Sequence, residues 1–359
     1  MYKRIVSILI IICMLLQCSA VIGYAAEKTD VDYGNISHSI EEQFPALKEF
    51  GLDIDIEDTV AIGEQIALYE VMPDGVYCNQ SIYPVYVKDM LSAFAVSIDG
   101  IHYQITTDLV KELSTYKGRS IALIYDNSNC YVYDGVSCSS LFEYAVSQDY
   151  RGCLKDVDLN DCDIKLQILQ SRTHLDINSE NILYATQAYY SVSVTGVPQV
   201  YSKTCWAAMI AMIKNCLSGS SLTAYNVATN VMGSTSSLVF NQGLTDSTIV
   251  SQMNSKYSLS YNYYNGVRSD SILEASITSG YPIFGSFTQA VTDSRHAGVI
   301  YGINIISGYV SVKDPRYITL NSTYSYSAYY SSGAYRYISL YNNEQHTLTR
   351  TICPSSAIY

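Results

Sequence analysis

The sequence predicts an α+β protein in which an acidic N-terminal domain precedes a slightly basic C-terminal domain. Its 359 residues leave room for two domains of about 100–200 residues after a leader. Residues 27–190 carry 27 acidic and 10 basic side chains, whereas residues 191–359 carry 6 and 9. Strand-like and helix-like segments occur in both parts, and 48 % of all residues are apolar, which is enough for hydrophobic cores.

The first 26 residues are predicted to be an export signal. Lys3 and Arg4 supply a positive start, and residues 5–16 are apolar apart from Ser7. Gly23 and Ala25 are small residues at the two positions that a signal peptidase reads. The apolar run is shorter than the roughly 20 residues that span a bilayer. We therefore expect a secreted protein with no stable membrane association once the signal is removed. An uncleaved membrane anchor is the alternative.

Composition excludes several classes of function. The formal net charge of -12 argues against a nucleic-acid partner, because phosphate binding needs clustered Lys and Arg. Ten cysteines are present, but no two of them form a C-x-x-C pair. The usual spacing of a zinc site is therefore missing, and we predict no metal site and no cofactor. The cysteine pattern alone assigns no disulfide.

Residues 27–185 are predicted to be a small α+β domain followed by a connector. Residues 82–87 and 120–125 are rich in β-branched and aromatic side chains, as in strands, and residues 107–116 are predicted to be a helix. Residues 155–185 are charged and poorly periodic, which is typical of a connector. The opposite charges of the two domains suggest that the acidic one docks on the other as a lid. Acidic surface that only keeps the chain soluble is the alternative.

Residues 186–359 are predicted to combine a buried helix with an antiparallel sheet. The stretch after Cys205 is almost entirely apolar and rich in helix formers, and it ends near Gly219. A second helix is expected over residues 270–279, followed by a strand at 282–287. Two further strands, at 297–303 and 309–314, flank a turn at 306–308.

Cys205 is the candidate nucleophile. It lies where the chain enters the first helix, and the positive end of a helix dipole favours the thiolate that nucleophilic attack requires. Gln199 lies six residues earlier, so its amide is placed to bind a developing oxyanion together with the Cys205 backbone N–H. A buried structural cysteine is the alternative for Cys205 taken alone.

His296 and Asp314 are the candidate base and its orienting carboxylate. Partners across a turn centred near residue 306 have numbers that sum to about 612, and these two sum to 610. We therefore expect the two side chains to lie close together on adjacent strands. A carboxylate beside an imidazole fixes its tautomer and supports its charged form. Asn304 competes for the orienting role but lies near the hairpin tip. The remaining histidines have no such partner by spacing and are expected at the surface or in packing: His38, His102, His174 and His346.

Four stretches resemble the bacterial papain-like cysteine peptidases, in particular the branch of bacteriocin leader peptidases and AvrRpt-type effector proteases. They are Val-Pro-Gln199 with Cys205-Trp-Ala-Ala, Gly280-Tyr-Pro-Ile, His296-Ala-Gly-Val-Ile-Tyr-Gly and Val-Lys-Asp314-Pro. The resemblance covers about residues 192–340. It implies Cys205 as nucleophile, His296 as general base, Asp314 as third member and Gln199 as oxyanion residue. Lys203-Thr204 departs from the plant and animal papains, which have Gly and a small residue there.

The resemblance also implies a fold and a precursor. A helix bearing the nucleophile would pack on an antiparallel sheet, and the acidic domain would stand where relatives carry a propeptide. The predicted function is a secreted cysteine endopeptidase made as a zymogen, with a polypeptide substrate and an intramolecular pro-domain as partners. One alternative is a secreted cell-wall amidase or endopeptidase of the Cys-His type, although the Asp-Cys-Ser-Gly motif of those enzymes is missing. The other is a catalytically inactive binding protein on the same fold.

Overall fold

The computed structural model describes most of the two predicted domains. It covers residues 33–50, 60–72, 75–98, 102–126, 129–134, 138–141, 173–174, 181–182, 189–236, 240, 242–290, 294–315, 324–340 and 344–358. The predicted export signal and most of the predicted connector lie outside these residues. Within them, no helix has both the length and the apolar character needed to cross a bilayer.

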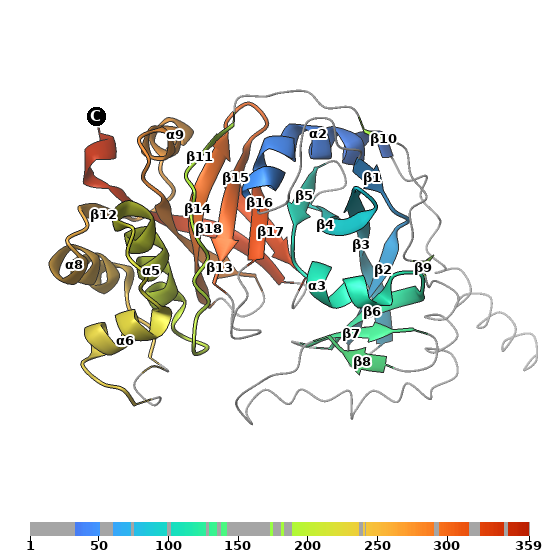
Figure 1. Cartoon of the computed structure of the whole chain (residues 1–359), viewed down its shortest axis with the longest axis horizontal. Coiled ribbons are helices and arrows are strands. Elements are labelled where there is room, and N and C mark those ends of the chain that lie inside the picture. Colours follow the sequence, from blue (N-terminus) through green and yellow to red (C-terminus); the bar gives the residue numbers. More distant parts are fainter. Residues whose placement is uncertain are drawn as a thin grey trace, which may run out of the picture.

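The acidic domain consists of one long helix and a twisted set of strands (Figure 1). Antiparallel pairs join β2 to β3, β3 to β4 and β4 to β5, while β2 also pairs in parallel with β6. The elements are α2 (Tyr33–Glu49), β1 (Val60–Ile62), β2 (Ile66–Met72), β3 (Gly75–Val87), β4 (Met90–Ser97), β5 (Tyr103–Thr106), α3 (Val110–Leu113), a 3-10 turn (Ser114–Tyr116), β6 (Ser120–Asp126), β7 (Asn129–Tyr133) and β8 (Cys138–Ser140).

Three short strands mark where the chain passes from one domain to the other. β9 (Thr173–His174) pairs with β6, and β10 (Asn181–Ile182) pairs with β1, so both add to the acidic domain. β11 (Tyr190–Ser191) pairs instead with β14 (Arg295–Asn304) of the C-terminal domain. The change of partner therefore falls between residues 182 and 190.

Helices dominate the described residues in the first part of the C-terminal domain. They are α5 (Cys205–Ser218), α6 (Ala224–Met232), α8 (Asp246–Tyr257) and α9 (Asp270–Thr278), with strand β12 (Tyr261–Tyr264) between the last two. α5 is buried from Trp206 to Ile213, as its apolar sequence predicts. It ends where Gly219 adopts a φ of 64° and donates its N–H to Asn215 O, a conformation that glycine adopts without steric cost.

The second part is a closed antiparallel barrel. Its strands are β13 (Ile283–Gln289), β14, β15 (Tyr309–Asp314), β16 (Tyr324–Ser331), β17 (Ala334–Ser339) and β18 (Glu344–Pro354), and a 3-10 turn (Ser355–Ile358) follows. Each strand pairs with the next, and β18 returns to pair with β13, which closes the ring. β12 extends β18 outside the ring.

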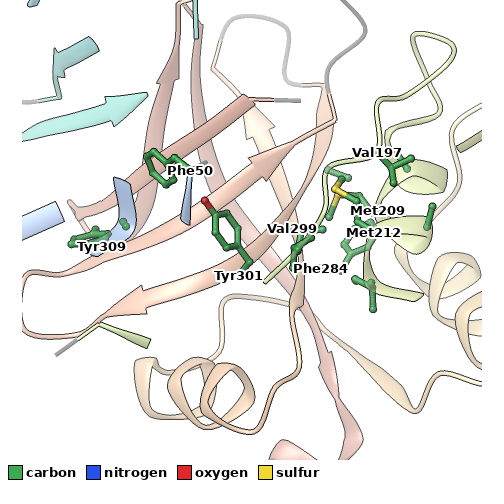
Figure 2. Packing of buried hydrophobic residues seen from close by; sticks show 14 of the residues in the cluster. Phe50, Val197, Met209, Met212, Phe284, Val299, Tyr301 and Tyr309 are labelled. Atoms are coloured by element: carbon green, nitrogen blue, oxygen red, sulfur yellow. The ribbon is translucent and has the colours of Figure 1, made fainter. Parts of the chain in front are cut away.

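α5 packs on the outer face of the barrel. Figure 2 shows Met209 and Met212 of α5 beside Phe284 and Val299, which are paired across β13 and β14. All four side chains are at most 1 % exposed. Because strand side chains alternate between faces, the neighbours of Phe284 and Val299 point into the barrel instead. The wall formed by β13 and β14 is therefore buried on both faces.

The predicted mixture of helices and antiparallel sheet is present, with two differences. The helix expected over residues 107–116 is shorter, since α3 begins only at Val110 after Leu109 takes a left-handed φ of 64°. Thr107 is instead held beside β16, where its N–H donates to Ser325 O over 3.2 Å. Closure of the sheet into a barrel was not predicted. The strands predicted at 82–87, 120–125 and 282–287 and the helix at 270–279 are confirmed, with ends that differ by at most seven residues.

Candidate active site

Cys205 is the first residue of α5, and a rigid turn fixes its position. The Thr204 side chain is fully buried, and its Oγ1 accepts hydrogen bonds from the N–H groups of Val200 and Tyr201 over 3.2 and 2.9 Å. The same hydroxyl donates to Tyr201 O over 2.8 Å. Cys205 is a free thiol of intermediate burial. The start of a helix is the positive end of its dipole, which favours a thiolate at this position.

Gln199 is tied to the hairpin that carries Asp314. Its backbone N–H donates to Pro315 O over 2.7 Å, directly after Asp314 in the chain. The Gln199 side chain is 6 % exposed, and its Nε2 donates to Ser202 O over 3.4 Å, near the outer limit for such a bond. Its Oε1 is buried without a hydrogen-bond partner among the described residues. The side-chain amide therefore has one weak hydrogen bond, to the loop that leads into Cys205.

His296 and Asp314 form the hydrogen bond that the hairpin predicts. His296 Nε2 lies 2.6 Å from Asp314 Oδ1, and Asp314 is fully buried. The register of β14 and β15 pairs Val299 with Lys313 and Ile300 with Val312, which gives the predicted sum of 612. The register shifts by one residue between Ile300 and Gly302, so the sum becomes 613 nearer the turn.

A glycine in β14 allows this arrangement. A Cβ atom on Gly298 would lie 2.8 Å from Val312 Cγ1 and 3.2 Å from Phe287 Cε2. Such distances are shorter than ordinary contacts, so a larger residue would push β14 away from β15. Gly298 stands two residues after His296 on the same strand. The close approach of the strands therefore depends on this position lacking a side chain.

The surroundings of His296 favour its charged form. Burial lowers the pKa of the ring. The Asp314 carboxylate beside it and hydrogen bonding to Cys205 raise this pKa, and together they outweigh burial, so that the pKa is about 9. Since Nε2 is used by Asp314, Nδ1 is the ring nitrogen left for the Cys205 sulfur. The side chains of Cys205, His296 and Asp314 therefore form a row in space, with His296 between the other two. An imidazolium held in this way stabilises a neighbouring thiolate.

Two aromatic side chains, Tyr337 and His346, lie beside this row, and the sequence did not predict their place there. The Tyr337 hydroxyl donates to Asp314 Oδ2 over 3.0 Å. His346 stacks on the Tyr337 ring with an interplanar angle of 4°, and it lies edge-on to His296 with ring centroids 5.6 Å apart. His346 was expected only to pack or to lie at the surface, and it is fully buried. Pairing of β17 with β18 joins these two residues, and no local sequence signal reveals that pairing.

The other sequence candidates take part elsewhere. Asn304 Oδ1 accepts the N–H groups of Ile306 and Ser307, both over 3.0 Å, so it stabilises the hairpin turn rather than the histidine. Trp206 is 2 % exposed and packs in the core. His38 lies 3.4 Å from Glu42 with an exposed side chain.

A buried carboxylate joins the helical part to the barrel next to His296. Asp246, at the start of α8, lies 3.0 Å from Arg295 and 2.9 Å from Arg350. Arg295 precedes His296 on β14, and Arg350 lies on β18. The interaction holds the first residues of β14 against α8. Among the described residues, no group of three His, Cys, Asp or Glu side chains is arranged to hold a metal ion.

A comparison with protein families gives a match to this part of the chain. Residues 189–332 match the family model described as papain-like cysteine protease AvrRpt2. The match spans less than half of the chain, and Gln199, Cys205, His296 and Asp314 all fall inside it. No curated protein matches the chain. The matched segment begins at the point where the strands change partner from the acidic domain to the barrel.

Proposed function

We propose that this chain, whose residues 189–332 belong to the papain-like cysteine proteases of the AvrRpt2 type, is a secreted endopeptidase made as a precursor. The chain is a cysteine peptidase, and its substrate is a polypeptide. The observation that carries the site assignment is the row of Cys205, His296 and Asp314, with 2.6 Å between the last two. In this proposal Cys205 is the nucleophile, His296 the acid and base, and Asp314 the group that orients the ring.

The first half of the reaction is acylation of Cys205. The thiolate attacks the carbonyl carbon of the scissile bond, and the carbonyl oxygen becomes an oxyanion. The backbone N–H of Cys205 and the Gln199 amide stabilise that oxyanion, because charge develops there only in the transition state. His296 then gives its proton to the leaving nitrogen. The C–N bond breaks, the amine leaves and a thioester to Cys205 remains.

The second half is hydrolysis of the thioester. Neutral His296 takes a proton from water, and the hydroxide formed attacks the thioester carbonyl. The C–S bond breaks, the thiolate is restored and the new carboxylate leaves. Asp314 remains ionised and stabilises the imidazolium, both in the resting pair with the Cys205 thiolate and when His296 takes a proton from water. The hydrogen bond from Tyr337 to the other oxygen of Asp314 supports this role.

The assignment of the nucleophile is tested by comparing two cysteines of the same helix. Cys205→Ser is expected to abolish hydrolysis of a fluorogenic peptide or casein while the fold stays intact. Cys216→Ser is the matched control, because burial raises the pKa of Cys216, which also lies in α5, and the thiol has no part in the proposed reaction. Full activity in a folded Cys205→Ser protein would show that the chain uses a different nucleophile. An equal loss in both variants would point to damage to the helix.

The precursor and secretion parts of the proposal rest on the sequence. The positively charged start and apolar run support export, and the acidic domain precedes the peptidase as propeptides do. Expression in a bacterial host with sequencing of the N-termini of the exported protein tests both. We expect one new terminus near residue 27 and a second one between the two domains. A single intact product in the cytoplasm would contradict this part without touching the nucleophile.

A further inference from the structure

The barrel has one incomplete seam, between β16 and β17. Their backbone pairing covers Tyr329 with Arg336, Tyr330 with Tyr335 and Ser331 with Ala334. The same register, continued, would place Ser327 opposite Ile338. Both of these residues instead bind β5 of the acidic domain. The two strands therefore separate at this point, and part of the other domain lies between them.

Gln104 makes the bonds that a neighbouring strand would make. Its Oε1 accepts the N–H of Ile338 over 2.6 Å, and its Nε2 donates to the carbonyl oxygen of Ile338. Gln104 is fully buried. Because a side-chain amide carries an acceptor oxygen and a donor NH₂ group in the same plane, it satisfies both backbone groups of Ile338 at once. Strand β17 thus has its backbone partner at this position in a side chain of the other domain.

The backbone of β5 pairs with the other side of the opening. Thr106 pairs with Tyr326 in antiparallel register, Ile105 N–H donates to Ser327 Oγ over 2.8 Å, and Thr107 N–H donates to Ser325 O. β5 therefore continues the sheet along the part of β16 that β17 leaves.

Asp108 then bridges the two separated strands. Its Oδ2 accepts hydrogen bonds from the Tyr326 hydroxyl on β16 over 2.8 Å and from the Ser339 hydroxyl on β17 over 3.4 Å. Asp108 is fully buried. The Tyr326 ring packs against the Tyr337 ring with centroids 4.6 Å apart. Tyr337 in turn binds Asp314, so the Asp108 bridge is connected to the candidate active site through these two rings.

A second contact comes from α2. Gln43 Nε2 donates to the Tyr329 hydroxyl over 3.0 Å, and the Tyr309 hydroxyl donates to the backbone oxygen of Glu42 over 3.0 Å. Two hydrophobic clusters also run through both domains, one containing Phe50 with Tyr309 and the other containing Leu109 with Tyr326. Figure 1 shows the acidic domain on the side of the barrel away from α5.

We propose that the acidic domain is a permanent structural part of the peptidase, with β5 completing the barrel, and that it stays bound after the chain is cut between the domains. The contacts described above are hydrogen bonds of amides, hydroxyls and backbone groups together with apolar packing. Surface charge pairs are screened by salt, whereas contacts of this kind are not. Docking should therefore be insensitive to salt, in contrast to the charge-driven docking expected from the sequence.

The test uses the full chain with Cys205→Ser, which prevents self-cleavage. A recognition sequence for a site-specific protease is inserted between β10 and β11, and the purified protein is cut there. The expected result is two fragments on a denaturing gel that elute as one species of unchanged mass in gel filtration, at 0.05 M and at 1 M NaCl. Separation of the soluble fragments at either salt concentration would overturn the proposal. Because no catalysis is measured, this outcome is independent of the assignment of the nucleophile.

Two glutamine variants, each compared with the unchanged protein, test the role of β5 itself. Gln104→Ala in the cut protein should lower the urea concentration at which the fragments separate. Gln80→Ala is the matched control, since Gln80 Nε2 binds Ser97 O within the acidic domain. Equal separation midpoints for the two variants would contradict the assignment of Gln104 as a substitute strand.

Discussion

The Tyr337 hydroxyl lies 3.0 Å from Asp314 Oδ2, and His296 binds the other oxygen of the same carboxylate. Both oxygens of Asp314 are thus held, and the carboxylate has a fixed plane in which to receive the imidazole. Hydrogen bonds to an ionised group are stronger than those between neutral groups, so this contact restrains the carboxylate well. Tyr337 is therefore expected to act as a positioning residue for the catalytic row.

Replacing Tyr337 by Phe should lower the turnover rate more than substrate binding. We expect kcat to fall roughly tenfold, equivalent to about 1.4 kcal/mol of transition-state stabilisation. KM should change little, because the Tyr337 side chain is fully buried and is therefore not available to bind substrate. Steady-state kinetics with a peptide substrate, together with the free energy of unfolding in urea, measure both effects.

Tyr335→Phe is the matched control. Its hydroxyl donates to Asp270 Oδ1 over 2.6 Å, so the same substitution removes a similar tyrosine–aspartate bond on the same strand. Each variant should lose about 1–3 kcal/mol of stability. Equal losses of kcat in the two variants would show that Tyr337 matters only for folding.

The pKa of His296 predicts a limit to activity at alkaline pH. The imidazolium, with a pKa of about 9 instead of the ordinary 6.5, should be present up to about pH 9, and kcat/KM should fall above it. Asp314→Asn removes the carboxylate charge, which is a main cause that raises this pKa. The alkaline limb of the pH profile should therefore move to lower pH in that variant. An unmoved limb would mean that another group titrates there.

The same shift makes folding stability depend on pH. Because the pKa is higher in the folded chain than in the unfolded one, the added stability is fully present below pH 6.5 and is lost as pH rises through about 9. The free energy of unfolding of the wild type should therefore decline between these values. His296→Gln should flatten this decline, as urea titrations at several pH values would show. The same slope in both proteins would contradict the assignment.

Gln199→Ala should lower kcat by roughly 10²–10³-fold, because an oxyanion donor acts mainly in the transition state. Gln252→Ala is the matched control, since Gln252 lies on α8 and also has a buried Oε1 without a partner in the described part of the chain. A change confined to KM would show that Gln199 only binds substrate.

Gly298→Ala should destabilise the barrel. The added Cβ would meet Val312 Cγ1 at 2.8 Å, and valine has little rotamer freedom with which to move away. Overpacking of this kind costs about 1–3 kcal/mol of stability. Gly243→Ala, where no atom lies within 4 Å of the added carbon, should change the free energy of unfolding much less. Similar urea curves for the two variants would show that the strands adjust freely.

Local patterns predicted the parts of this site that neighbouring residues determine. The apolar run after Cys205 predicts the helix, and the spacing around the turn at 306–308 predicts the approach of His296 to Asp314. Both depend on contacts within about 20 residues of sequence. The turn chemistry is local too, which is why Asn304 could be set aside for the orienting role.

Longer-range pairing could not be predicted in the same way. The barrel closes because β13 pairs with β18, and this pairing together with that of β13 and β14 brings His346 near His296. The role of Gln104 requires a gap between two strands more than 200 residues away. Periodicity records which face of a strand is buried and carries no information about which strand lies next to it. Tyr337, which binds Asp314, and His346, which stacks on Tyr337, were therefore not predicted.

Labelling of the thiols is the most direct test of Cys205 as the nucleophile that His296 activates. The intact chain and the chain cut between the domains are treated with an epoxysuccinyl reagent, and the adducts are located by peptide mass spectrometry. We expect modification of Cys205, and loss of this modification in His296→Ala. Cys216 and Cys353 should react far more slowly, since burial raises the pKa of each, to about 11 for Cys353. Equal labelling of all three thiols would contradict the assignment of Cys205 as the nucleophile. No labelling of Cys205, in the intact chain or in the cut chain, would contradict it as well.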